Sequence, residues 1–235
     1  MITVLQPFVK LPSAWIEAGG LRDFRWKPDG SDETAALMIL AVIAHHVHPL
    51  TGIARLTYDQ LVAMTGISRS KAAAGLDILA RRSIIERLPE GRSSYKLANY
   101  DPTSGWAKFP ARGLYRFGSV AAFEDFKLRR PAELDALKLY FLFAARRSRE
   151  LNMAPISYGK IEEYSGVKEP RIKTALSVLT ANELVHVERF TSCKSENGIA
   201  HAYRLTHLEG HQHLGTIGRD HDFDLGLVVS AADIQ

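Results

Sequence analysis

The sequence predicts an α+β fold, mainly helical, in which a unit of three helices and a β-hairpin occurs twice. The main observation is a repeat: residues 56–67 (LTYDQLVAMTGI) resemble residues 156–167 (ISYGKIEEYSGV) at an offset of one hundred residues. Each segment is followed by an amphipathic helical pattern and then by two strand-like runs. Because solenoid repeats are much shorter, a period of this length indicates a duplicated domain.

The composition is typical of a globular protein without a membrane segment. A chain of 235 residues has room for two domains, and its 46% hydrophobic and 24% charged residues suit a packed fold. No apolar run is long enough to span a bilayer, and the first residues lack a signal-peptide pattern. The single cysteine, Cys193, fits a reducing compartment. We therefore expect a cytoplasmic protein without a membrane partner.

The first helix of copy one is predicted over residues 33–46. Ser31 and Asp32, which are favourable N-cap types, precede it, and Pro49 follows it. A short strand over residues 54–56 comes next. Apolar residues at helical spacing indicate a single apolar stripe on the helix, formed by Leu37, Leu40, Ala41 and Ala44.

The next two helices of copy one are separated by a tight turn. Thr57 and Gln60 form a capping-box pattern at the start of the first of them. Gly66 supplies the backbone freedom that the turn requires. Ser68 suits the N-cap of the following helix, which is predicted over residues 69–82. Its inner face is expected to carry Ala72, Leu76 and Leu79, and its outer face Arg69, Ser70, Lys71, Ala73, Ala74 and Asp77.

Copy two repeats this order of helices. Its first helix is predicted over residues 133–150, with Pro131 suited to the first turn. Ser157 is the expected N-cap of the second helix, which ends before Gly166. The third helix is predicted over residues 168–182.

Each copy ends in two strand-like runs joined by turn-forming residues, which predicts a β-hairpin. The runs are residues 83–88 and 94–97 in copy one, and 184–190 and 202–205 in copy two. The second hairpin is eight residues longer than the first, and loop-forming residue types fill the difference.

The duplication extends further towards the N-terminus. Residues 10–12 (KLP) and 108–110 (KFP) lead into the two copies at an offset of 98 residues. The expected organisation is an N-terminal domain with its lead segment (1–100), a basic linker or lead segment (101–130), a C-terminal domain (131–207) and an acidic, histidine-containing tail (208–235).

Charge is distributed unevenly along the chain, whose net charge is +4. Residues 57–97 carry seven Lys or Arg against four Asp or Glu, and residues 98–156 carry ten against six. Residues 206–235 carry one Arg against five acidic residues. The basic segments are compatible with nucleic-acid binding, but weakly basic domains without that role are common.

The repeated unit resembles the winged helix-turn-helix of bacterial regulators over residues 31–97 and 131–205. The likeness depends on the Gly66-Ile67-Ser68-Arg69 turn and the Ser83-Ile84-Ile85 ending. Copy one departs from the family pattern where Arg82-Ser83 replaces a glycine, and copy two where Lys168 replaces a serine and Pro170 follows. Two such units in a chain of this length also resemble plasmid replication initiators of the tandem winged-helix type, by architecture and size alone.

The resemblance implies that the third helix of each unit enters the major groove of duplex DNA while the hairpin, or wing, contacts the minor groove or the phosphates. Capped N-termini of the second helices would anchor phosphates. Glu169 is an acceptor suited to a cytosine amino group. The candidate DNA-binding residues of copy one are Thr57, Ser68, Arg69, Ser70, Lys71, Ala74 and Arg92. Those of copy two are Ser157, Lys168, Glu169, Arg171, Lys173, Thr174 and Lys194.

The leading hypothesis is a sequence-specific duplex-DNA-binding protein, active as a monomer or a homodimer, that regulates transcription from a bacterial chromosome or mobile element. One alternative is a replication initiator that binds origin repeats, and another is a protein-interaction module of a chromosome-maintenance complex. Two histidine groups, residues 45–48 and 207–221, lack the spacing of a zinc motif. We find no catalytic or phosphate-cradling motif and expect neither enzymatic activity nor a cofactor.

Overall fold

The computed structural model describes residues 5–89, 93–191 and 199–208. In this part of the chain the protein is α+β and roughly half helical, with seven α-helices and four small antiparallel sheets. None of the described helices is long and apolar enough to cross a membrane.

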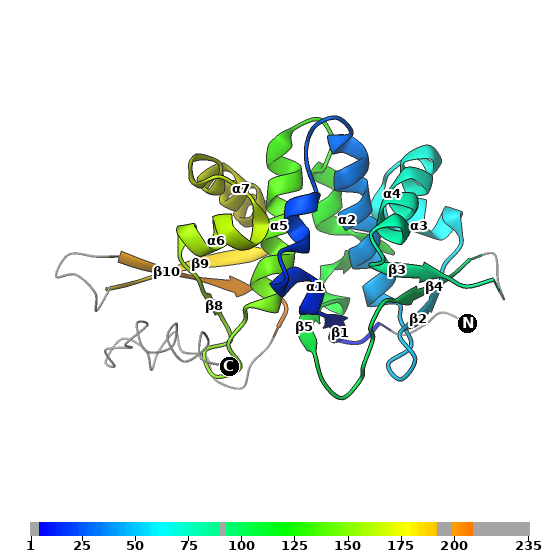
Figure 1. The fold of residues 1–235 in the computed structure, drawn as a ribbon, viewed down its shortest axis with the longest axis horizontal. Coiled ribbons are helices and arrows are strands. Elements are labelled where there is room, and N and C mark those ends of the chain that lie inside the picture. The colour runs from blue at the N-terminus through cyan, green and yellow to red at the C-terminus, as the bar shows by residue number, and fades with distance from the viewer. Residues whose placement is uncertain (1–4, 90–92, 192–198, 209–235) are drawn as a thin grey trace.

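The chain forms two halves with the same order of main elements (Figure 1). The first contains β1 (Phe8–Pro12), α1 (Ala14–Glu17), the 3-10 helix η1 (Gly20–Asp23), α2 (Gly30–His45), β2 (Ile53–Arg55), α3 (Tyr58–Thr65), α4 (Arg69–Arg81), β3 (Ile85–Arg87) and β4 (Ser94–Leu97). The second contains β5 (Trp106–Pro110), η2 (Arg112–Leu114), β6 (Tyr115–Arg116), β7 (Ser119–Val120), η3 (Ala121–Asp125), α5 (Pro131–Ala145), β8 (Ala154–Pro155), α6 (Tyr158–Ser165), α7 (Glu169–Ala181), β9 (Val185–Thr191) and β10 (Ile199–Leu205).

Each half has a three-stranded antiparallel sheet of the same topology. The strand order is β2-β4-β3 in the first half and β8-β10-β9 in the second. In both sheets the last strand of the half lies in the middle, so the hairpin is joined to the short strand that precedes the second helix. This pairing attaches each hairpin to its helices.

Helices α2 and α5 pack against each other at the centre, with α4 on α2 and α7 on α5. The prediction of a single apolar stripe on the first helix is wrong, because every residue from Ala35 to Ala44 is buried. The helix lies between α4 and α5 and so buries several faces. Gly75 permits the close approach of α4, since a Cβ there would meet Ile39 and the backbone of Ala36.

Two predicted helix ends differ from the structure. Helix α2 begins at Gly30, with Asp29 at the N-cap position, and so starts before the predicted caps Ser31 and Asp32. Asp32 instead forms an ion pair with α4. Helix α5 ends at Ala145 and not near residue 150, because the chain turns towards β8.

The lead segments of the two halves form one structure, since β1 pairs antiparallel with β5. Phe109 on β5 is fully buried. Its ring stacks on Phe141 of α5 at 5.1 Å between centroids and on His45 of α2 at 5.4 Å. Residues 101–130 therefore contribute to the central core as well as connecting the halves.

The second residue after the third helix of each half adopts a left-handed backbone conformation, with φ 53° at Ser83 and 55° at Glu183. This is the position at which the family pattern has glycine. A side chain in this conformation strains the backbone. We expect Ser83→Gly to raise the free energy of unfolding by about 1 kcal/mol, measured by urea unfolding. Ser93→Gly serves as a control outside this conformation, and unchanged or lower stability of Ser83→Gly would refute the assignment of strain.

Candidate nucleic-acid interface

The start of α3 is closed by the predicted capping box. The Thr57 hydroxyl accepts the backbone N–H of Gln60 at 3.2 Å, and the Gln60 side chain accepts the N–H of Thr57 at 2.8 Å. Gly66 ends the helix with φ 72°, as expected for the tight turn. Ser68 then caps α4 by accepting the N–H of Lys71 at 3.3 Å. These local bonds hold the start of α4 at the surface, where Ser68, Arg69 and Ser70 are exposed.

Arg69 is the most accessible cation at the start of α4, with 68% of its side chain exposed. Its guanidinium donates to Asp59 at 2.7 Å and lies 5.2 Å from the centre of the Tyr58 ring. An exposed pair of this kind contributes little free energy, because water screens it and the side chains lose freedom. The guanidinium is therefore held near the start of α4 at little cost in free energy and can exchange partners.

Lys71 does not point outward as predicted. Its amine donates to Asp32 and to Ser31, both at 2.6 Å, and so fastens α4 to the start of α2. Ala74, one turn further along α4, is half-buried. The exposed polar surface at the start of this helix is thus narrower than the sequence suggests, and is formed mainly by Arg69 and Ser70.

The N-termini of α6 and α7 in the second half are capped in different ways. Ser157 caps α6 by accepting the N–H of Lys160 at 3.4 Å. At the N-cap of α7, Lys168 stands where copy one has serine, and its side chain makes no capping bond. Glu162 of α6 supplies the missing cap. Its carboxylate accepts a hydrogen bond from the Glu169 N–H at 3.1 Å and another from the Lys168 amine at 2.7 Å. These hydrogen bonds lower the pKa of the Glu162 carboxyl.

Arg171 occupies the position in α7 that Lys71 occupies in α4, and it is held in the same way. Its guanidinium lies 2.5 Å from the carboxylate of Asp135, which is almost fully buried in α5. Arg171 is thus exposed on the predicted outer face, with 47% of its side chain accessible, but its guanidinium is engaged in an ion pair. In both halves the third residue of the third helix anchors it to the central helix.

A basic and aromatic surface extends from α7 onto the hairpin β9–β10. Lys173 and Thr174 are exposed on α7. Arg189 pairs across the hairpin with His201, on which the Tyr158 ring stacks at 5.7 Å. Burial, followed by the charges of Arg189 and Lys173, lowers the pKa of His201. Arg189 and His201 thus lie opposite each other on the hairpin, and the charge of Lys173 on α7 also acts on His201.

Tyr158, Arg189 and His201 were missed from the sequence. The usable signal was the period-two pattern of β10, which places His201 on the face of the buried Tyr203. Conversely, the predicted wing residues Arg92 and Lys194 lie outside the described residues.

Comparison with models of known protein families and with curated protein sequences finds no match to this chain.

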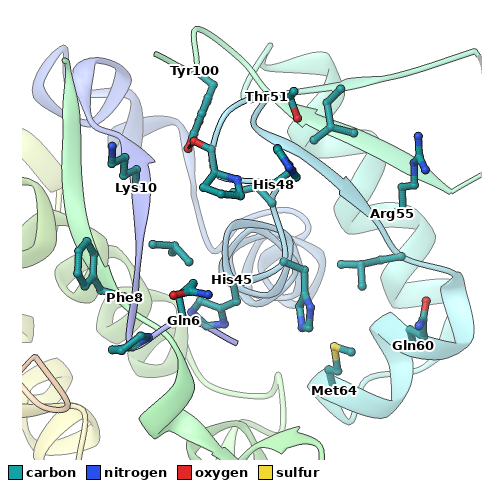
Figure 2. Close-up of a pocket in the computed structure, with 17 residues that line it drawn as sticks. Gln6, Phe8, Lys10, His45, His48, Thr51, Arg55, Gln60, Met64 and Tyr100 are labelled. Carbon is teal, nitrogen blue, oxygen red and sulfur yellow. Dashed lines mark hydrogen bonds between the residues drawn. The ribbon is translucent and has the colours of Figure 1, made fainter. Parts of the chain in front are cut away.

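An open cavity of about 1190 Å³ lies in the first half, below the end of α2 and between β1 and α3 (Figure 2). His45, His46 and His48 all border it. The His45 imidazole is buried and lies 3.0 Å from the Tyr115 hydroxyl. Among the described residues no group of three His, Cys, Asp or Glu side chains is arranged to hold a metal ion.

Burial, followed by the charge of His46, lowers the pKa of His45 from its ordinary value of 6.5 to about 3. Between these pH values the unfolded chain binds a proton at this site that the folded protein does not, so stability is lost as the pH falls below 6.5. We expect a loss of about 2 kcal/mol from this group between pH 6.5 and 5. Urea unfolding across this range should show the loss in the native protein and in an exposed-site control, His48→Gln. In His45→Phe the free energy of unfolding should depend less steeply on pH. The same slope as in the native protein would contradict the assignment of this loss to His45.

Proposed function

We propose that this protein is a sequence-specific duplex-DNA-binding protein of the tandem winged-helix type that regulates transcription. The observation that carries the proposal is the twofold occurrence of one constellation. In each half a capped short helix, a left-handed glycine and an exposed third-helix N-terminus stand beside a three-stranded sheet with a hairpin. This is the combination with which winged helices bind the major groove and its flanking phosphates.

In this proposal α4 and α7 are the two DNA readers. Arg69 is the donor for a guanine edge in the first reader, since its planar guanidinium matches the O6 and N7 acceptors. Thr174 and Glu169 face the bases in the second, and Lys173 and Arg189 contact phosphates. The ion pairs of Lys71 and Arg171 support the proposal, because they limit the motion of α4 relative to α2 and of α7 relative to α5.

The surface of the described residues favours DNA over a protein partner at these helices. A protein-binding face usually carries a cluster of apolar side chains. The large hydrophobic side chains that are strongly exposed in the described ranges are Leu50 and Phe117, and neither lies on α4, α7 or the hairpins. The exposed faces of the proposed readers are instead polar and charged.

The proposal predicts that Arg69→Ala weakens binding to the preferred site by about 1–3 kcal/mol and relaxes the base preference at one position. Asp59→Asn, which removes the competing carboxylate, is the matched variant and should leave affinity unchanged or raise it. Both are measured by fluorescence anisotropy on the preferred duplex and its single-base variants. Equal affinity of Arg69→Ala and the native protein for every duplex would remove Arg69 from the interface.

The genomic position of the preferred site then distinguishes two roles. A site in a promoter supports regulation of transcription, whereas repeated sites in a replication origin support initiation of replication.

A further inference from the structure

The β1–β5 ribbon is symmetric about one central pair of residues that occupy equivalent positions in the two halves. Lys10 and Lys108 are equivalent by the offset of 98 residues, and they lie directly opposite each other. On one side of this pair Val9 lies opposite Phe109, the counterpart of Leu11, and on the other Leu11 lies opposite Ala107, the counterpart of Val9. A twofold axis through the central pair produces this exchange.

The side chains of the ribbon obey the same symmetry. The amine of Lys10 lies 4.9 Å from the ring centre of Trp106, and the amine of Lys108 lies 4.3 Å from that of Phe8. Phe8 and Trp106 are counterparts at the same offset. Each lysine thus covers the aromatic ring that opens the opposite strand, as expected for an interface between two equivalent surfaces.

Outside the ribbon, the contacts between the two halves show the same twofold relation. The segment η1 of the first half contacts α6 of the second, where Arg22 lies against Gly166. The segment β7, at the counterpart position in the second half, contacts α3 of the first. The lead segment of each half therefore packs on the second helix of the other half, so the relation is reciprocal and not head-to-tail.

The two halves are also fixed to each other. Helices α2 and α5 pack side by side, and the buried Lys138 amine of α5 donates to the Phe24 carbonyl oxygen of the first half at 2.9 Å. Figure 1 shows α4 and α7 on opposite sides of this central pair, with the two hairpins extending in opposite directions. The readers are held as in a symmetric dimer, within one chain.

We infer that one chain recognises an inverted pair of half-sites on a single duplex, at one spacing. This inference rests on the proposed function. A twofold rotation reverses the direction in which the second reader meets the duplex, so its half-site runs on the opposite strand. The exposed groups differ between the readers, with Arg69 and Ser70 on α4 and Glu169 and Thr174 on α7. The two half-sites therefore have different sequences, and the repeat is an imperfect one.

The test uses the two half-motifs recovered by selection from random duplexes with the full chain. They are placed on duplexes in inverted and in direct orientation at the selected spacing, and in inverted orientation with 5 base pairs inserted, about half a helical turn. Each half-motif alone in neutral flanking sequence is the control. Dissociation constants are measured by fluorescence anisotropy, and the number of chains per duplex by analytical ultracentrifugation.

We expect the inverted duplex to bind one chain at least about tenfold more tightly than either single half-motif, because the second contact is intramolecular. Direct orientation and the 5-base-pair insertion should reduce affinity to that of a single half-motif. Thr174→Ala should weaken only the duplexes that contain the second half-motif. Equal affinity for direct and inverted duplexes, or two chains on each inverted duplex, overturns the inference while leaving DNA binding intact. Failure to select any half-motif instead removes the proposed function itself.

Discussion

Replacement of Phe109 by alanine is expected to lower the free energy of unfolding by about 3–5 kcal/mol, the largest effect we predict for a single side chain in the core. The ring is fully buried and contacts His45 of α2 and both Tyr140 and Phe141 of α5. Its removal leaves a cavity where both central helices meet the β1–β5 ribbon, and such a site collapses poorly because three elements converge on it. The change is measured by urea unfolding followed by circular dichroism.

Phe8→Ala is the matched control for Phe109→Ala. Phe8 lies on the same ribbon but is only partly buried, beneath the amine of Lys108. We expect it to cost about 1 kcal/mol, since less apolar area is lost. Similar losses from the two variants would contradict the central place in the core that we assign to the Phe109 ring.

The second large effect is expected from Arg82→Ala at the end of α4. The Arg82 guanidinium forms a bidentate pair with Glu33 of α2 at 2.6 and 2.7 Å, donates to the Asp23 carbonyl oxygen at 2.8 Å, and lies 4.2 Å from the Phe24 ring centre. Both side chains of the pair are largely buried. Removing the cation leaves the Glu33 carboxylate in the core without its partner, so we expect a loss of about 3 kcal/mol.

Arg81→Ala, at an exposed neighbouring position, should change stability by less than about 0.5 kcal/mol. Adding Glu33→Gln to Arg82→Ala should recover part of the loss, because the unpaired charge is then removed. Additive losses in the double variant, measured by the same urea unfolding, would show that the pair does not couple α4 to α2.

The helices and hairpins could be predicted because their signals are local. Thr57 with Gln60, Gly66 and Ser68 close α3 and α4 as predicted, and their bonds join residues at most four positions apart. The repeat predicts the order of elements in the second half. This order is kept although Glu162, and not the residue at position 168, caps the N-terminus of α7. Local hydrogen bonds of this kind leave a pattern that can be read along the chain.

The arrangement of the two halves could not be predicted in this way. The β1–β5 pairing and the ion pairs Lys71–Asp32 and Arg171–Asp135 join residues 36 to 102 positions apart. Local periodicity does not encode such contacts, so it reveals neither the ion pairs that hold Lys71 and Arg171 nor the burial of α2 on several faces. For the same reason the hairpin residues Arg189 and His201 were overlooked.

The most direct test of the central claim is selection of purified full-length protein on random duplex DNA, followed by sequencing and by binding measurements across a salt series. The account predicts an enriched motif with two distinct halves and an affinity that falls steeply, as a power of the salt concentration, because phosphate contacts release counterions. It also predicts that Arg69→Ala loses the preference in one half of the motif only. No enriched motif, with weak binding that salt does not change, would contradict the claim that α4 and α7 read DNA.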